Sequence, residues 1–329
     1  FFGFGCSNTS ENSMNPFFID YDNPFEIPPF TKIKETHYMP AFNQGMKEQL
    51  NEIDEITNNP DAPTFENTIV ELERTGKTLS KVADVFFNLL SSNTNDEMDK
   101  IAAEVSPKLS VHSDAISLNK NLFDRVHTVY NQREELGLNT EQMRLVEETH
   151  KGFIRSGVQL NETSMAKLTK INQELSSLSV QFDQNLLKET NEGFSLIVED
   201  EKQLDGLPQD FVDQAAKLAE ENGQEGKWMF KPTRVSMYPF LTYSTQRDLR
   251  EKLYTSYIKR GDNDNDRDNK DLAIKMADLR LERSNILGYK THADFVLDNT
   301  MAKNTERVKN LLDQVWKPGL TRAKKEAEE

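Results

Sequence analysis

The sequence has a single cysteine and a shortage of basic residues, and each excludes a class of protein. With one Cys among 329 residues, no disulfide can form within the chain. Lys and Arg number 40 against 55 Asp and Glu, which gives a formal net charge of −15. Nucleic-acid binding depends on clustered basic side chains that release counterions from phosphates, so this charge argues against a nucleic-acid partner.

Long apolar runs and paired histidines are also missing. No apolar run reaches the roughly 18 to 20 residues that a membrane-spanning helix requires, so we predict no membrane span. None of the histidines begins the His–Glu–x–x–His pattern that places two zinc ligands and a base on one helix face. They are His37, His112, His127, His150 and His292. We therefore predict no catalytic residue, cofactor-binding residue or metal ligand in these 329 residues.

Two of the histidines need a closer look. His150 follows two glutamates on an expected helix. It could be a metal ligand together with a residue distant in the sequence, but a structural histidine on a helix face is favoured. His292 follows Thr291, which with Asp294 forms an acidic capping box at the start of a helix. We expect His292 to be a structural residue at a solvated corner.

Two short polar motifs resemble ligand-binding loops but depart from them. GDNDNDRDNKD at 261–271 alternates acids like a calcium loop, yet Arg267 or Asn269 stands where the sharp turn needs glycine. We expect instead a polar loop that caps the next helix. TGKT at 75–78 lacks the earlier glycine of a phosphate-binding loop, because that position is Glu71.

The first residues suggest a lipid anchor. FFGFGC places apolar and small residues directly before Cys6, and a polar tail follows. This order is typical of a bacterial lipoprotein signal, in which the cysteine accepts the lipid. Cys6 is therefore the candidate lipidation site, with a periplasmic-side envelope location. The alternatives are a disordered terminus with a chance cysteine, and a cytoplasmic location.

Hydrophobic periodicity predicts a mostly α-helical protein. After a proline-rich arm at 15–40, apolar residues recur with the helical period of about 3.6. Helices are expected at about 41–58, 64–93, 95–119, 121–135, 140–156, 161–190, 246–260, 269–287, 292–299 and 304–329. Residues 191–245 break this rhythm and predict a small mixed α/β insert, in which FSLIVED reads as a strand and KWMFKPTRVSMYPFLTYS as strand and loop.

Local signals mark several helix boundaries. Thr94 with Glu97 predicts a capping box before the third helix, and Asn139 with Gln142 predicts another before the fifth. Pro107 is expected to kink or split the third helix, because proline removes one hydrogen bond and clashes with the preceding turn.

Several separated segments resemble one peptidase family. The run at 238–304, which contains RLERSNILGYKTHADFVL, resembles the segment that precedes the catalytic core of M3-family zinc metallopeptidases. NPFFIDYDNPFEIPPFTKIKETHYMPAFNQGMKEQ and PTFENTIVELERTG resemble the start of the same family. Within the family the chain is most similar to the bacterial peptidyl-dipeptidase (Dcp) group, with oligopeptidase A as the nearest relative. The similarity runs from about Asn15 to the end.

The resemblance implies a fold and an activity. The fold would be an elongated multi-helix body that forms one wall of a deep channel, as in neurolysin and Dcp. The activity would be release of dipeptides from the C-terminus of oligopeptides by a zinc-activated water. In the family one zinc ion is held by a His–Glu–x–x–His helix and a downstream Glu, and these elements would follow Glu329. We expect the N-terminal portion of such an enzyme, inactive alone and monomeric when complete.

On this basis the chain divides into four parts. Residues 1–14 are a signal remnant and polar tail, and 15–190 are an N-terminal helical domain with its extended arm. Residues 191–245 are the α/β insert, and 246–329 begin the catalytic helical domain, truncated before the zinc site. The alternative is a stand-alone, non-catalytic helical module that binds peptides or a protein.

Overall fold

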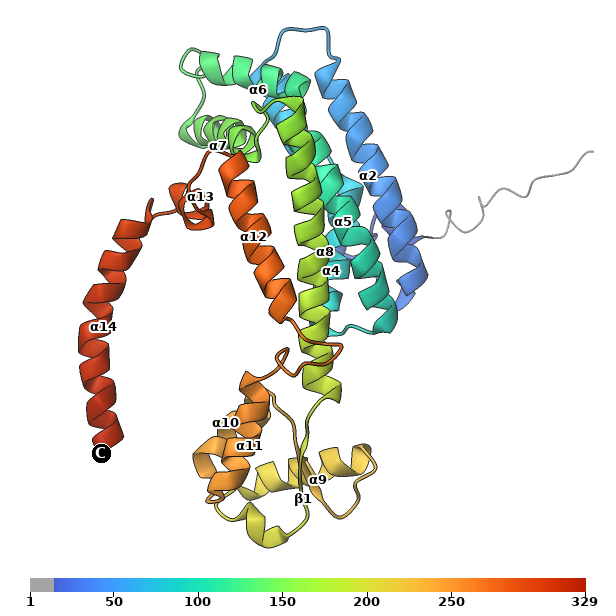
Figure 1. Ribbon diagram of the computed structural model, residues 1–329. Coiled ribbons are helices and arrows are strands. Elements are labelled where there is room, and N and C mark those ends of the chain that lie inside the picture. Colours follow the sequence, from blue (N-terminus) through green and yellow to red (C-terminus); the bar gives the residue numbers. More distant parts are fainter. Residues whose placement is uncertain (1–14) are drawn as a thin grey trace, which may run out of the picture. The chain divides into compact units, whose positions relative to one another are not determined.

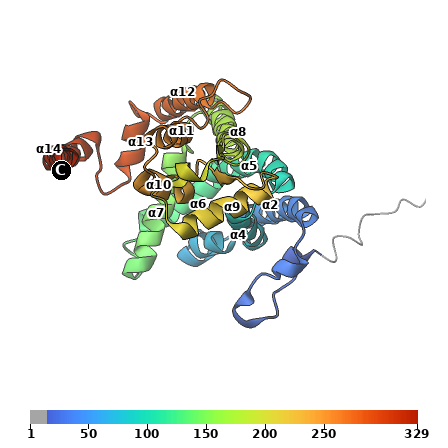
Figure 2. The ribbon, with the colours of Figure 1, turned by 90° about the horizontal axis from the view of Figure 1, so that it is seen from below.

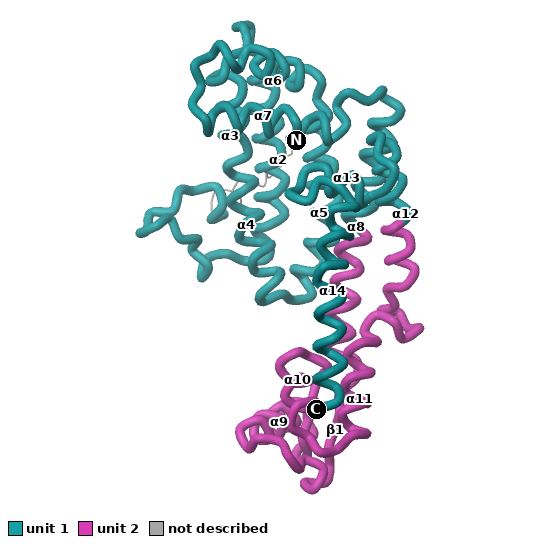
Figure 3. Tube along the Cα trace, turned by 90° about the vertical axis from the view of Figure 1, so that its left-hand side faces the viewer, with its two compact units in different colours: residues 1–177, 278–329 teal, residues 178–277 magenta. Residues whose placement is uncertain are grey.

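The computed structural model describes residues 15–329 and is mostly α-helical, as predicted (Figure 1). Contacts between Cα atoms divide the chain into unit 1, residues 1–177 and 278–329, and unit 2, residues 178–277 (Figure 3). The four-part domain division stays a prediction. Among residues 15–329, no helix combines the length and the apolar character needed to cross a membrane.

Unit 1 is a helical body. It begins with the 3-10 turns η1 (Pro16–Phe18), η2 (Pro24–Glu26) and η3 (Phe30–Lys32). It continues with α2 (Glu35–Thr57), the π-helical turn η4 (Phe65–Val70), α3 (Glu71–Arg74), α4 (Lys77–Ser92), α5 (Asp96–Ser117), α6 (Lys120–Gln132) and α7 (Thr140–Ser156). Two helices, α8 (Glu162–Glu192) and α12 (Lys270–Ile286), are shared between the units. The last two are α13 (His292–Asp298) and α14 (Thr305–Glu328).

Helices α2, α4 and α5 pack against one another as a bundle, which is seen end-on in Figure 2. Aromatic rings fill its centre. Phe86 of α4 meets Phe42 of α2 edge to face, with ring centroids 5.4 Å apart, and meets Tyr38 at 5.0 Å. Phe17 of η1 is buried against Tyr38. Such pairs add about 0.5–1.5 kcal/mol beyond their buried area, so they anchor the N-terminal arm to the bundle.

A second core joins α6 and α7 to the same bundle (Figure 1). Apolar side chains repeat on one face of each helix and meet at the centre of this core. Its fully buried members include Ile53, Ile69, Leu122, Val126, Val129, Val146 and Val158.

Unit 2 contains a small sheet and three helices of its own. Its elements are β1 (Leu196–Val198), η5 (Glu201–Leu204), α9 (Gln209–Glu221), β2 (Trp228–Phe230), α10 (Arg234–Tyr243) and α11 (Arg247–Ile258). The strands are antiparallel, with Leu196 opposite Phe230. Their buried face packs against Met237 and Phe240 of α10 and Leu253 of α11.

The structure corrects several local expectations. The helix expected over 64–93 is broken at Gly76, which has φ +75°. Thr75 and Gly76 of the TGKT segment lie at this break, and Lys77 and Thr78 begin α4. The Gly76 amide donates to Glu52 Oε2 at 2.7 Å, so a side chain from α2 fixes the turn. Helix α2 begins at Glu35, inside the predicted arm, and accommodates Pro40 in its second turn.

The expectation of strand and loop was wrong for α10. Its residues Met237 and Phe240 are buried three positions apart, which is a helical spacing that a short apolar run does not distinguish from a strand. The cap of α5 was misplaced by one residue: Asn95, not Thr94, accepts from the amides of Glu97 and Met98.

Helix α5 continues through Pro107 instead of splitting there. Proline removes the hydrogen bond to the carbonyl four residues earlier, which belongs to Ala103. Ala103 is exposed, so water can satisfy that carbonyl.

Candidate functional site

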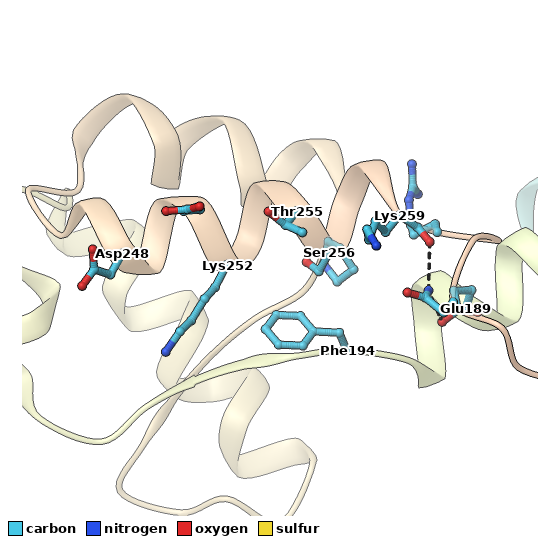
Figure 4. A pocket seen from close by; sticks show the side chains of 11 residues that line it. Glu189, Phe194, Asp248, Lys252, Thr255, Ser256 and Lys259 are labelled. Atoms are coloured by element: carbon cyan, nitrogen blue, oxygen red, sulfur yellow. Dashed lines mark hydrogen bonds between the residues drawn. The ribbon is translucent and has the colours of Figure 1, made fainter.

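A groove in unit 2 is the candidate functional site (Figure 4). Its volume is about 620 Å³, within the range of about 300–1,000 Å³ that is typical of ligand pockets. One wall is a face of α11, and the opposite side comes from the end of α8 and the segments next to the strands. The lining residues are Glu189, Phe194, Pro232, Asp248, Glu251, Lys252, Thr255, Ser256, Lys259, Arg260 and Asn263.

Helix α11 supplies a polar wall because its sequence is amphipathic. The six lining positions from Asp248 to Lys259 are spaced by one, three or four residues, which places them on one side of the helix. Leu253 is fully buried on the other side, with Leu249 and Tyr257 packed beside it against the core of unit 2. Burial of that apolar face therefore turns the charged face into the groove.

Phe194 forms the apolar floor of the groove. Its ring faces α11 near Lys252 and Ser256 (Figure 4) and is 44% exposed. The preceding residue must be glycine in this conformation, because a Cβ on Gly193 would lie 2.3 Å from the carbonyl oxygen of Glu189. This close approach at the end of α8 fixes where the phenyl ring stands.

A hydrogen-bonded network holds the end of the groove near Glu189. Glu189 is only 6% exposed, and its Oε1 accepts from Asn263 Nδ2 at 3.1 Å and its Oε2 from Asn265 Nδ2 at 3.3 Å. Arg260 donates to Thr190 Oγ1 at 3.0 Å and stacks over Tyr257 at 4.0 Å. Buried carboxylates are costly unless hydrogen-bonded, so the two amides stabilise Glu189 here.

The charges in the groove are separated along α11. Asp248 and Glu251 lie in the first half of the helix, whereas Lys259 and Arg260 directly follow its last residue. Within residues 15–329, no carboxylate pairs with the ammonium groups of Lys252 or Lys259, so both are available to a ligand. The groove is lined by neither His nor Cys. It is suited to binding a ligand with an apolar part and charges of both signs.

The acidic loop at 261–271 surrounds a lysine. Lys270 Nζ donates to Asp262 at 2.7 Å, to Asp264 at 2.9 Å and to Asp268 at 2.7 Å. Asp268 Oδ1 also accepts from the Lys270 amide at 2.9 Å and caps α12, as predicted. The hydrogen bond from the Lys270 ammonium is the main reason why the pKa of Asp268 falls to about 2.

His292 is half-buried, so the corner where it lies is only partly solvated, and its structural role stays a prediction. Thr291 Oγ1 accepts from the Asp294 amide at 3.1 Å and caps α13 as predicted. The histidine ring lies against Phe295, and its pKa is lowered first by burial and then by the positive charge of Arg283. The Arg283 guanidinium of α12 lies 5.5 Å from the centre of the same Phe295 ring, so the histidine sits in a packed corner.

The other histidines have separate partners. His37 Nδ1 accepts from the Lys34 amide at 3.0 Å, and His112 Nε2 lies 2.7 Å from Gln49 Oε1. His150 does have a distant partner, because its Nε2 lies 2.9 Å from His127 Nδ1.

The described residues do not fit the zinc centre that the family resemblance implies. A catalytic zinc ion takes three protein ligands, and within residues 15–329 no three His, Cys, Asp or Glu side chains gather to hold an ion. The absence of catalytic residues from the whole chain stays a prediction, and Cys6 lies outside the described residues.

Comparison with known proteins shows what this chain is similar to. Residues 240–329 match the family model of peptidase family M3. The chain is 34% identical to a dipeptidyl carboxypeptidase of Escherichia coli over 314 residues, which are 95% of this chain and 46% of that protein. The predicted resemblance to the M3 peptidases is confirmed. An oligopeptidase A of Haemophilus influenzae is 29% identical over 307 residues, which cover 92% of this chain and 45% of that protein.

This M3-like chain spans about half the length of the curated relatives it matches. The family match begins inside α10 and includes all of α11, so one wall of the groove lies within it. The groove was not predicted from the sequence. The polar face of α11 was visible as a spacing of three and four residues, but nothing in the sequence placed Phe194 or Glu189 opposite to it.

Proposed function

We propose that this chain is part of a zinc metallopeptidase of the M3 family that releases dipeptides from the C-terminus of oligopeptides. The observation that carries the proposal is the 34% identity to a dipeptidyl carboxypeptidase over 95% of the chain. The zinc-binding His–Glu–x–x–His helix would be supplied by residues that this sequence does not contain, so the chain alone is inactive. Its own contribution is to bind and orient the peptide.

The groove in unit 2 supports peptide binding through its charges and its apolar floor. From Asp248 to Lys259 the helix rises about 16 Å at about 1.5 Å per residue, which equals about five residues of extended peptide. A short peptide with both termini free could place its ammonium near Asp248 and its carboxylate near Lys259. An apolar side chain in the middle would cover Phe194.

Binding of a five-residue peptide with an apolar central residue tests this role. We expect Phe194→Ala to weaken binding at least about fivefold, because truncating a well-packed aromatic anchor costs more than about 1 kcal/mol. Phe25→Ala is the matched control, because Phe25 lies in η2 of unit 1 and is 93% exposed. Equal affinities of the two variants would contradict a role for the groove.

Zinc-dependent release of dipeptides tests the enzymatic part of the proposal. The chain alone should release none, and activity without further residues would overturn the assignment of the catalytic site to another segment. DNA that continues in frame beyond Glu329 into a His–Glu–x–x–His helix supports the peptidase. A stop codon at that point, with a proper start upstream, favours the non-catalytic binding module.

We also propose a lipid anchor at Cys6 and an envelope location, on the strength of the apolar and small residues before the cysteine. Metabolic labelling with a radioactive fatty acid should mark the protein and should fail for Cys6→Ser. An unmodified Cys6 in a cytosolic fraction, found by mass spectrometry, would contradict the anchor.

A further inference from the structure

Two histidines of unit 1 face each other across the contact between α6 and α7. His127 Nδ1 and His150 Nε2 are 2.9 Å apart, with one hydrogen bond between the two rings. Their ring centroids are 5.1 Å apart and their planes differ by 23°. Each helix thus directs one imidazole nitrogen to the same point, although the two residues are 23 positions apart in the sequence.

The surroundings hold one ring still and leave the other accessible. His150 is 7% exposed, and its ring stacks on Tyr130 with centroids 3.9 Å apart and planes within 6°. Phe123 stacks beside it at 5.4 Å, and the Arg133 guanidinium lies over Tyr130 at 4.0 Å. His127 is exposed. A ligand from solvent therefore reaches a pair in which the inner ring is already fixed.

We propose that His127 and His150 form a two-ligand binding site for a divalent transition-metal ion such as Zn²⁺. Zinc–imidazole bonds of about 2.0–2.1 Å place two ligand nitrogens about 2.9–3.3 Å apart when the angle at the metal is about 90–110°. The observed separation of 2.9 Å already matches the lower end of that range. Imidazole is the side chain that zinc, copper and nickel ions share as a preferred ligand.

The ion takes the place of the proton that the two rings share. That proton leaves the bridging nitrogen, and the other nitrogen of the same ring takes up a proton from water, so each ring remains neutral and no proton is released overall. A turn of the exposed His127 ring brings both lone pairs onto the ion.

This site differs from the catalytic zinc centre of the proposed peptidase. In residues 15–329 no third His, Cys, Asp or Glu side chain joins the pair, so water molecules complete the coordination. A centre with two protein ligands from two helices fits a stabilising role, in which the ion ties α6 to α7. Lys151, next to His150, forms an ion pair with Glu148 at 2.6 Å, so its charge is partly offset.

Calorimetric titration with Zn²⁺ tests the site in the Cys6→Ser background, which removes the only thiol. We expect one ion per chain, and His127→Ala should weaken its binding by at least about tenfold, because losing even an outer-shell partner of a metal-bound histidine costs about 10–100-fold. His37→Ala is the matched control and should keep the parent affinity. Unchanged affinity in His127→Ala would overturn the proposal.

A second readout guards against misfolding of the variants. In the unsubstituted protein, Zn²⁺ should shift the imidazole ¹⁵N resonances of His127 and His150 together, and those of His112 and His292 should stay in place. Shifts confined to other histidines would exclude this pair as the site. Because His127 is exposed, its replacement should leave the far-ultraviolet circular dichroism unchanged.

Discussion

Helices α4 and α14 carry the same kind of apolar stripe, but only α4 buries it. In α4, Val82 and Phe86 are fully buried against the bundle of unit 1. In α14, Leu312 is 60% exposed and Trp316 is 67% exposed. Both helices are amphipathic, and both were expected from the period of their apolar residues. The period of the apolar residues therefore predicts which face of a helix is apolar, but it does not predict what covers that face.

The exposed apolar stripe of α14 is consistent with the greater length of the relatives. Exposed apolar stripes of this size mark interaction surfaces or aggregation sites. The relatives are about twice as long as this chain, so in them further polypeptide is available to cover an equivalent helix.

The largest difference in stability between equivalent changes in α4 and α14 is expected when one aromatic residue of each helix is truncated. Phe86→Ala should lower the free energy of unfolding by about 3–5 kcal/mol, because it leaves a cavity in a packed core. Trp316→Ala should change it by less than about 0.5 kcal/mol, as for other surface substitutions. Urea denaturation followed by circular dichroism measures both. Similar losses in the two variants would show that α14 is packed in solution.

Removing the stripe of α14 should change association more than stability. The unsubstituted chain is expected to self-associate or aggregate, because its exposed leucines, valine and tryptophan can be buried only between molecules. Leu312→Glu combined with Trp316→Glu should raise the monomer fraction in light scattering coupled to size-exclusion chromatography. The matched control is Lys309→Glu combined with Asp313→Lys, which changes charges on the same helix but leaves the stripe intact. A monodisperse unsubstituted monomer would contradict this expectation.

Gly152 within α7 and Gly157, which follows the last residue of that helix, give a smaller contrast between an open and a packed position. A Cβ at Gly157, where φ is +96°, would lie 2.8 Å from Leu160 and 3.0 Å from Leu168. At Gly152, within the helix, it would meet nothing within 4 Å. Gly157→Ala should therefore destabilise by about 1–3 kcal/mol through overpacking and backbone strain. Gly152→Ala should stabilise by about 0.5–1 kcal/mol through helix propensity. Thermal unfolding of both variants measures the signs, and equal signs would contradict the structure.

Local chemistry decides how much of this fold could be predicted. Helix α7 was placed correctly at both ends, because Asn139 with Gln142 caps its start and Gly157 adopts the left-handed conformation that ends it. Helix α10 was missed, since its apolar residues fit either a helix or a strand until the core of unit 2 selects one. The ends of α7 are determined by neighbouring residues in the sequence, whereas the helical conformation of α10 is determined by tertiary packing.

The candidate site was harder to predict than the fold. Phe194 meets α11 only because the chain turns at Gly193 and returns through β1, and one sequence contains no sign of that contact. The partner of His150 was left open for the same reason, because His127 belongs to a different helix. Periodicity defines which face of a helix is polar, whereas tertiary packing decides what lies opposite to it.

The smallest effect concerns the loop before α12, where the ammonium group of Lys270 pairs with three carboxylates. Hydrogen bonds from Lys270 hold the pKa of Asp268 at about 2, below its ordinary value of 3.8. Because the folded-state pKa is depressed, the stabilisation is present above the unfolded value and is lost as the pH falls through about 2. Carboxyl ¹³C shifts should therefore titrate near that pH, and Lys270→Met should move the midpoint upward. Asp271→Asn, which keeps Lys270, is the control. A midpoint that does not respond to Lys270→Met would mean that the ammonium group does not hold the loop.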